Sequence, residues 1–88
     1  MLDIGEGAGA LVVRAPASLA GVEIELARTG EHHAFTHTEV RERILPDGAV
    51  YAGVYPAIVV GEYTLLDVDG KPRRTLTITE GAVTEVDW

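Results

Sequence analysis

Short apolar runs alternate with turn residues along the whole chain. In residues 22–26 the apolar Val22, Ile24 and Leu26 alternate with Glu23 and Glu25, which is the period of a strand with one buried and one exposed face. Comparable β-rich runs, each followed by glycine, proline or aspartate, recur about every 8–12 residues, a spacing typical of sandwiches and barrels. The pattern predicts an all-β fold.

Seven strands are expected. They cover residues 9–14, 21–28, 35–45, 49–55, 61–67, 74–79 and 82–88. Pro56 is expected to end the fourth strand, and Asp47-Gly48 and Asp69-Gly70 are expected hairpin turns, because these pairs favour the tight turns that connect antiparallel strands.

The third run, 35–45, fits two structures. Thr36 with Glu39 resembles a helix capping box, and Val40 with Ile44 has helical spacing. Against this, an unbroken polar set recurs with period two. Its members are His37, Glu39, Arg41 and Arg43. We favour one long strand that enters a hairpin at Asp47-Gly48.

Residues 47–83, DGAVYAGVYPAIVVGEYTLLDVDGKPRRTLTITEGAV, resemble the second half of the transthyretin-like (prealbumin-like) sandwiches. These include the carboxypeptidase regulatory-like domains and the B-type repeats of collagen adhesins. Gly48 opens a strand, Tyr55-Pro56 stands at a loop, and Gly61-Glu-Tyr63-Thr-Leu65 matches their G-x-Y-x-L motif. The resemblance implies a seven-stranded antiparallel β-sandwich in which the Tyr63 ring is buried and its hydroxyl is bonded.

The activities of two such families do not carry over. The relatives that hydrolyse 5-hydroxyisourate end in Tyr-Arg-Gly-Ser, whereas this chain ends in EVDW; adhesin repeats often carry a Lys–Asn cross-link, and this chain has no asparagine. Ser18 is the only serine, in a loop without the G-x-S-x-G pattern of a nucleophile elbow. We therefore expect a protein that is not an enzyme.

Composition narrows the partners. The 88 residues suffice for one domain, 1–88, in which 1–8 are expected to be disordered, and the net charge is −7. An acidic chain repels phosphate, so neither nucleic acid nor an anionic membrane is an expected partner. No cysteine is present, no apolar run reaches the roughly 18 residues of a membrane span, and the N-terminus is acidic rather than basic. A cytoplasmic location is expected.

The three histidines lie together in GEHHAFTHTE. His32, His33 and His37, with Glu31 or Glu39, form a candidate site for zinc or another divalent metal, or for hydrolysis. On a strand, however, residues four apart are about 13 Å from each other, too far for one metal. An exposed polar loop is the main expectation, and the metal or hydrolytic site remains the alternative function, with no cofactor otherwise expected.

Two surface features point to binding instead. Ile58, Val59 and Val60 follow Ala57 in an expected loop and cannot all point inward. Glu39, Arg41 and Arg43 would form a charged face on one side of a strand. The hypothesis is a non-catalytic module that binds a protein or carbohydrate, or assembles with copies of itself, through these two features.

Overall fold

The computed structural model describes residues 7–31 and 34–88. In chain order its elements are β1 (Ala8–Ala15), η1 (Ala17–Leu19), β2 (Glu23–Arg28), β3 (Thr36–Glu39), β4 (Arg41–Leu45), β5 (Gly48–Val59), β6 (Gly61–Leu66), β7 (Pro72–Ile78) and β8 (Val83–Asp87). The all-β prediction is confirmed, and η1 is a single turn of 3₁₀ helix. The described residues contain no helix long and apolar enough to cross a membrane.

Most of the segment 1–8, which was expected to be disordered, lies outside the described residues. Only its last two members are described, and Ala8 already belongs to β1, where it pairs with Val59 of β5. The expectation of disorder is therefore wrong for Ala8.

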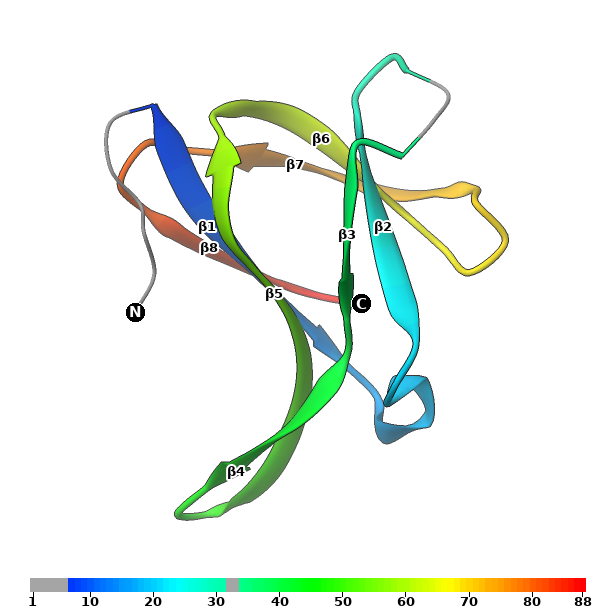
Figure 1. Cartoon of the computed structure of the whole chain (residues 1–88), viewed down its shortest axis with the longest axis vertical. Helices are drawn as coiled ribbons and strands as arrows, with labels where there is room; N and C mark the ends of the chain where they lie inside the picture. The colour runs from blue at the N-terminus through cyan, green and yellow to red at the C-terminus, as the bar shows by residue number, and fades with distance from the viewer. Residues whose placement is uncertain (1–6, 32–33) are drawn as a thin grey trace.

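The strands form two four-stranded sheets packed as a sandwich (Figure 1). Sheet A has the order β4-β5-β1-β8, and sheet B has the order β3-β2-β6-β7. The prediction of a purely antiparallel sandwich is wrong, because β1 pairs with β8 in parallel. The first and last strands are neighbours in sheet A and run in the same direction. No turn residue in the sequence predicts this pairing, because the two strands are far apart along the chain.

The predicted strand 35–45 is real but divided, so the described residues form eight strands rather than seven. Residues Thr36–Glu39 pair with β2 in sheet B, and Arg41–Leu45 pair with β5 in sheet A. Val40, fully buried between them, exchanges backbone hydrogen bonds with the segment before β2: its N–H donates to Val22 O and its oxygen accepts from Gly21 N. The strand thus changes sheets at Val40.

Pro56 does not end the fourth predicted strand, which corresponds to β5 in the structure. β5 continues to Val59, and its register against β1 shifts where Tyr55 and Ile58 face Leu11 and Gly9. Three residue steps on β5 therefore match two on β1, which is a bulge. Proline lacks an N–H and is tolerated in a sheet at such a site. The predicted loop at Ala57 is wrong for this reason.

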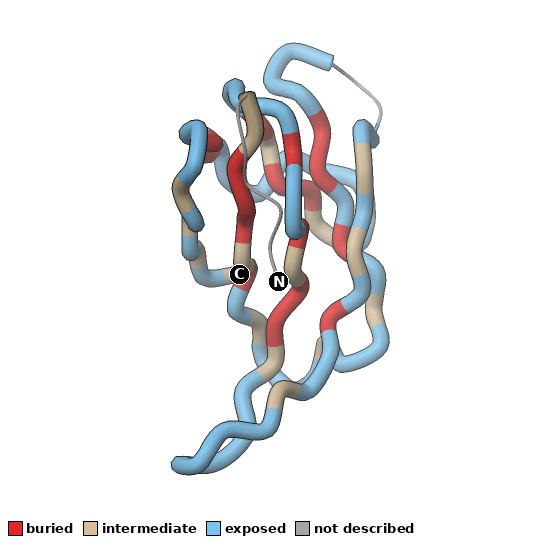
Figure 2. Tube along the Cα trace, turned by 60° about the vertical axis from the view of Figure 1, so that its left-hand side comes forward, coloured by how far each residue is buried: buried red, intermediate tan, exposed pale blue. Residues whose placement is uncertain are grey.

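The core lies between the sheets, and the β4–β5 hairpin that projects beyond it is largely exposed (Figure 2). The buried members of the core are Leu11, Val13, Ile24, Leu26, Val40, Tyr55, Ile58, Tyr63, Leu65, Leu76 and Ile78. The predicted alternation in 22–26 is confirmed in β2, and β6 and β7 also alternate buried with more exposed residues along part of their length. The Tyr63 ring is buried and its hydroxyl donates to Val59 O at 2.6 Å, so the G-x-Y-x-L segment performs the role expected of it.

The turn between β6 and β7 is closed by one carboxylate. Asp67 Oδ1 accepts hydrogen bonds from the backbone N–H groups of Asp69, at 2.9 Å, and Lys71, at 3.0 Å. The bond from Lys71 is the largest cause that lowers the pKa of Asp67 below its ordinary value. The predicted hairpin turn at Asp69-Gly70 is confirmed.

Candidate binding surface

Arg41 and Arg43 lie on the outer face of sheet A. They stand directly opposite Ala52 and Val50 of β5, and opposite residues of an antiparallel pair point to the same side. On β5, Val50 and Ala52 alternate with Tyr51 and Gly53, and Tyr51 packs against the core. The arginines and their partners therefore point away from the core.

The same face continues across β1 and β8. Val12 is opposite Val54 on one side and Glu85 on the other, and Ala10 is opposite Val83. Together with Val59 at the end of β5, these side chains make a largely aliphatic surface, here called the valine face. Its members are Ala10, Val12, Val50, Ala52, Val54, Val59 and Val83.

The valine face is partly exposed. Val59, Val83 and Val50 are 52%, 45% and 40% exposed, and Val12 and Val54 are half-buried. Ala10 and Ala52, on the same face, are buried. Within residues 7–31 and 34–88 no third layer covers this side of sheet A. Each residue alone resembles an ordinary strand residue in the sequence, so the surface was missed there.

Charges flank the valine face asymmetrically. The β4 edge carries Arg41 and Arg43, and the β8 edge carries Glu85 and Asp87. Arg14, between them on β1, forms ion pairs of 2.8 Å with both Glu85 and Asp87. The hydrogen bond to Asp87 is the main cause that raises the pKa of Arg14 above its ordinary value. One edge is therefore basic and the other is acidic.

The predicted charged face is only partly assembled. Glu39 belongs to β3 in sheet B, on the other side of the sheet change at Val40, although its Oε1 is 3.7 Å from Arg41 Nη2. Arg43 is half-buried, and its Nε is enclosed without a hydrogen-bond partner among the described residues. Arg41 and Arg43 remain together on the valine face; Glu39 does not.

The predicted segment Ala57–Val60 is also divided. Ile58 is 8% exposed and belongs to the core, whereas Val59 and Val60 are exposed and Ala57 lies in the bulge. The expectation that the three apolar side chains cannot all point inward is correct. Val59 lies on the same face of sheet A as Arg41 and Arg43, but at the opposite end of β5.

The histidine hypothesis is tested only at His37, because His32 and His33 lie outside the described residues. His37 is exposed on β3, and its Nε2 is 3.2 Å from Glu23 Oε2. Nowhere in 7–31 and 34–88 do three potential metal ligands converge. Ser18 lies in η1, before β2, and His37 lies in β3, opposite Glu25 of β2.

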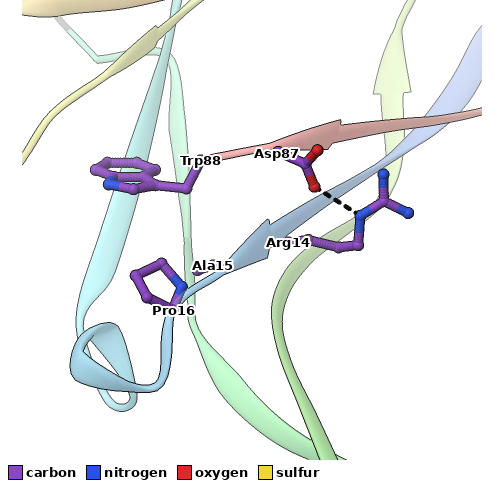
Figure 3. Close-up of a pocket in the computed structure, with 5 residues that line it drawn as sticks. All are labelled: Arg14, Ala15, Pro16, Asp87 and Trp88. Atoms are coloured by element: carbon purple, nitrogen blue, oxygen red, sulfur yellow. Dashed lines mark hydrogen bonds and ion pairs between the residues drawn. The ribbon is translucent and has the colours of Figure 1, made fainter.

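A shallow groove lies at the end of β1 and β8. It has a volume of about 280 Å³ and is lined by Arg14, Ala15, Pro16, Asp87 and Trp88. Figure 3 shows Asp87 turned toward Arg14 and the Trp88 ring on the side of Pro16. The Arg73 guanidinium lies 4.4 Å from the centre of the indole, and its nitrogens donate to the Trp88 main-chain oxygen.

These contacts show that the residues of the groove mainly contact one another and the core, which leaves little surface for a ligand. Trp88 packs against the core, and its main-chain N–H donates to Arg14 O at 2.7 Å. One face of its indole is already occupied by Arg73. The valine face is therefore the more open of the two surfaces. No protein-family model matches the chain, and neither characterised proteins nor solved structures gave a match.

Proposed function

We propose that this chain is a transthyretin-like β-sandwich that acts as a non-catalytic binding or assembly module, with the valine face as its contact surface. The observation that carries the proposal is the exposure of that face: Val50, Val59 and Val83 are each at least 40% exposed on one side of one sheet. Single exposed apolar residues are ordinary, but several exposed apolar residues on one sheet face, with charged neighbours, are typical of a protein contact.

The family assignment is supported by the second half of the chain. Gly48 opens β5 with φ +137° and Gly61 opens β6 with φ +148°, backbone conformations that favour glycine. Tyr63, two residues after Gly61, packs in the core, and its hydroxyl donates to Val59 O. These features agree with the glycine turn, strand and G-x-Y-x-L order of the transthyretin-like sandwiches.

A protein partner is favoured by the chemistry of the surface. Valine and alanine side chains make dispersion contacts and form a flat surface. The flanking arginines and carboxylates would fix the orientation of a bound partner through charge complementarity. The apolar side chains stand over a rigid four-stranded sheet, so little conformational entropy is lost when a partner covers them.

Site-specific photo-crosslinking tests this function. A photoreactive phenylalanine analogue replaces Val12, in the centre of the valine face, and the matched control replaces Thr77, which is exposed on β7 of sheet B. Irradiation in the protein's own cells is expected to give a discrete adduct from position 12 and none from position 77. No adduct from position 12, or equal adducts from both, overturns the proposal.

A further inference from the structure

We infer that the occupant of the valine face is a second copy of this chain, packed face to face about a two-fold axis parallel to the strands of sheet A. The inference rests on the proposed function and specifies its partner. It is drawn from the order of charges and side-chain sizes across the sheet, which is complementary to itself in this orientation.

The charges select the axis. A two-fold axis that runs parallel to the strands, in the plane between two facing sheets, reverses the strand order of the second copy. It places basic β4 over acidic β8. An axis perpendicular to the strands, in the same plane, instead places Arg41 and Arg43 over the basic β4 edge of the second copy. Like charges in contact are destabilising, so the parallel axis is favoured.

The residue rows agree with this axis. One row across sheet A reads Arg41, Ala52, Arg14, Asp87 from β4 to β8. When the order is reversed, Arg41 meets Asp87 of the second copy, and Arg14 meets the small side chain of Ala52. Arg14 is the only long side chain in the middle of the row, and an alanine faces it.

The next row is apolar in its centre. Val54 and Val12 are neighbours on β5 and β1, so the reversed copy places Val12 against Val54 and Val54 against Val12. Sheets in aligned packing lie about 10 Å apart with strands within about 30° of each other. Valine side chains fill such a gap at the centre of this row, and Glu85 lies at its β8 end.

The expected dimer is weak. Four strands about 4.8 Å apart and about 20 Å long give a projected area of about 400 Å² per chain. A standard interface buries about 800 Å² of accessible surface per partner. The accessible area of this face exceeds its projected area because side chains protrude from the sheet, but it stays below that of a standard interface. The net charge of −7 adds repulsion between copies. Association is therefore expected to depend on concentration.

Charge exchange in the purified protein tests the geometry. Sedimentation equilibrium is measured from about 10 μM to about 1 mM chain at about 0.15 M salt. The wild-type mass is expected to rise toward twice the 9.4 kDa of one chain. Arg41→Asp and Asp87→Arg are each expected to raise the dissociation constant at least about tenfold, because each places like charges in contact. Thermal unfolding checks that each variant is folded.

An equimolar mixture of the two variants is the decisive arm. In a mixed dimer, the aspartate introduced on β4 of one chain meets the arginine introduced on β8 of the other. The unchanged Arg41 and Asp87 meet at the second, symmetry-related contact, so wild-type association is expected to return. The control, Glu62→Arg, makes a charge reversal on an exposed residue of β6 in sheet B and is expected to associate like the wild type.

Two results overturn the inference. One is a chain that stays monomeric to about 1 mM, the upper limit of the affinity range considered; the other is association that neither reversal weakens or that the mixture does not restore. The photo-crosslinking outcome separates the two proposals. An adduct from position 12 with a different protein, together with a monomeric chain, refutes the second copy and leaves the binding function standing. No adduct from position 12 refutes both.

Discussion

At the scale of single residues, the hydroxyl of one tyrosine forms a hydrogen bond between the two sheets. Tyr55 points inward from β5 of sheet A, and its hydroxyl donates to Ile24 O of β2 in sheet B at 2.7 Å. Tyr51, four residues earlier, is half-buried, and its hydroxyl lies 3.4 Å from Glu42 Oε2 at the surface. The same strand thus contains two tyrosines with different hydrogen-bond environments.

Tyr55→Phe is expected to lower the free energy of unfolding by about 1–2 kcal/mol, because a buried hydrogen bond is lost while the ring remains. Tyr51→Phe, the matched control, is expected to change it by less than about 0.5 kcal/mol. Urea unfolding at neutral pH measures both. Equal losses in the two variants contradict the assigned role of the Tyr55 hydroxyl.

The same hydroxyl makes stability depend on alkaline pH. Burial, and to a smaller extent the charge of Glu25, raises the pKa of Tyr55 well above its ordinary value. Above about pH 10 the unfolded chain releases this proton and the folded chain retains it, so stability falls by up to about 1.4 kcal/mol per pH unit. Tyr55→Phe is expected to have a correspondingly shallower slope between about pH 9 and 11. An identical slope in the variant contradicts this account.

At the scale of elements, the change of sheet between β3 and β4 requires β5 to pass close to β2 and β3. Gly53 of β5 is the point of closest approach. A Cβ added there would lie 2.8 Å from Thr38 Cγ2 and 2.9 Å from Ile24 Cδ1. The Thr38 hydroxyl also donates a hydrogen bond to Val54 O at 2.9 Å. The two sheets are thus in contact at a position where a Cβ would crowd the side chains of Thr38 and Ile24.

Gly53→Ala is expected to destabilise the fold by about 1–3 kcal/mol, the usual cost of overpacking a core. Thr38→Ser in the same chain removes Cγ2 and keeps the hydroxyl, so it is expected to recover part of the loss. The midpoint of urea unfolding measures the single and double variants. A Gly53→Ala variant as stable as the wild type, or no recovery in the double variant, contradicts the close approach.

At the scale of the whole molecule, the two outer faces differ in chemistry. The outer face of sheet A combines aliphatic residues with the charged Arg14, Arg41, Arg43, Glu85 and Asp87, whereas that of sheet B carries Glu23, Glu25, His37 and the exposed threonines Thr75 and Thr77. A sandwich needs its inner faces to be apolar, but nothing in folding requires valine on an outer face. This difference directs the proposed contact to sheet A.

The metal hypothesis also belongs to this scale. Among residues 7–31 and 34–88, His37 with Glu23 offers two ligands, whereas structural zinc takes four. We therefore expect the thermal unfolding midpoint in excess zinc to equal that in EDTA. Ligand at about 100 times its dissociation constant adds about 2.7 kcal/mol, a shift on the order of ten degrees in a chain of this size. Such a rise, abolished by His37→Ala, contradicts the expectation and restores the histidine site.

The sequence by itself determined what depends on neighbouring residues. Alternation in 22–26 was predicted correctly because the two-residue period of a strand is set by the backbone. The buried Tyr63 was expected from the resemblance of the G-x-Y-x-L segment, and Tyr63 is buried. The hairpin turn at Asp69-Gly70 was predicted correctly because an aspartate and a glycine specify its hydrogen bonds within the short segment from Asp67 to Lys71.

Only the tertiary structure decided which strands share a sheet. The change of sheet at Val40, the parallel pairing of β1 with β8 and the bulge that carries β5 past Pro56 all depend on partners far along the chain. The valine face is the clearest case. Val12, Val54 and Val83 come from three strands, and they form one surface because long-range backbone pairing, which leaves no periodic signal in any single segment, places them side by side.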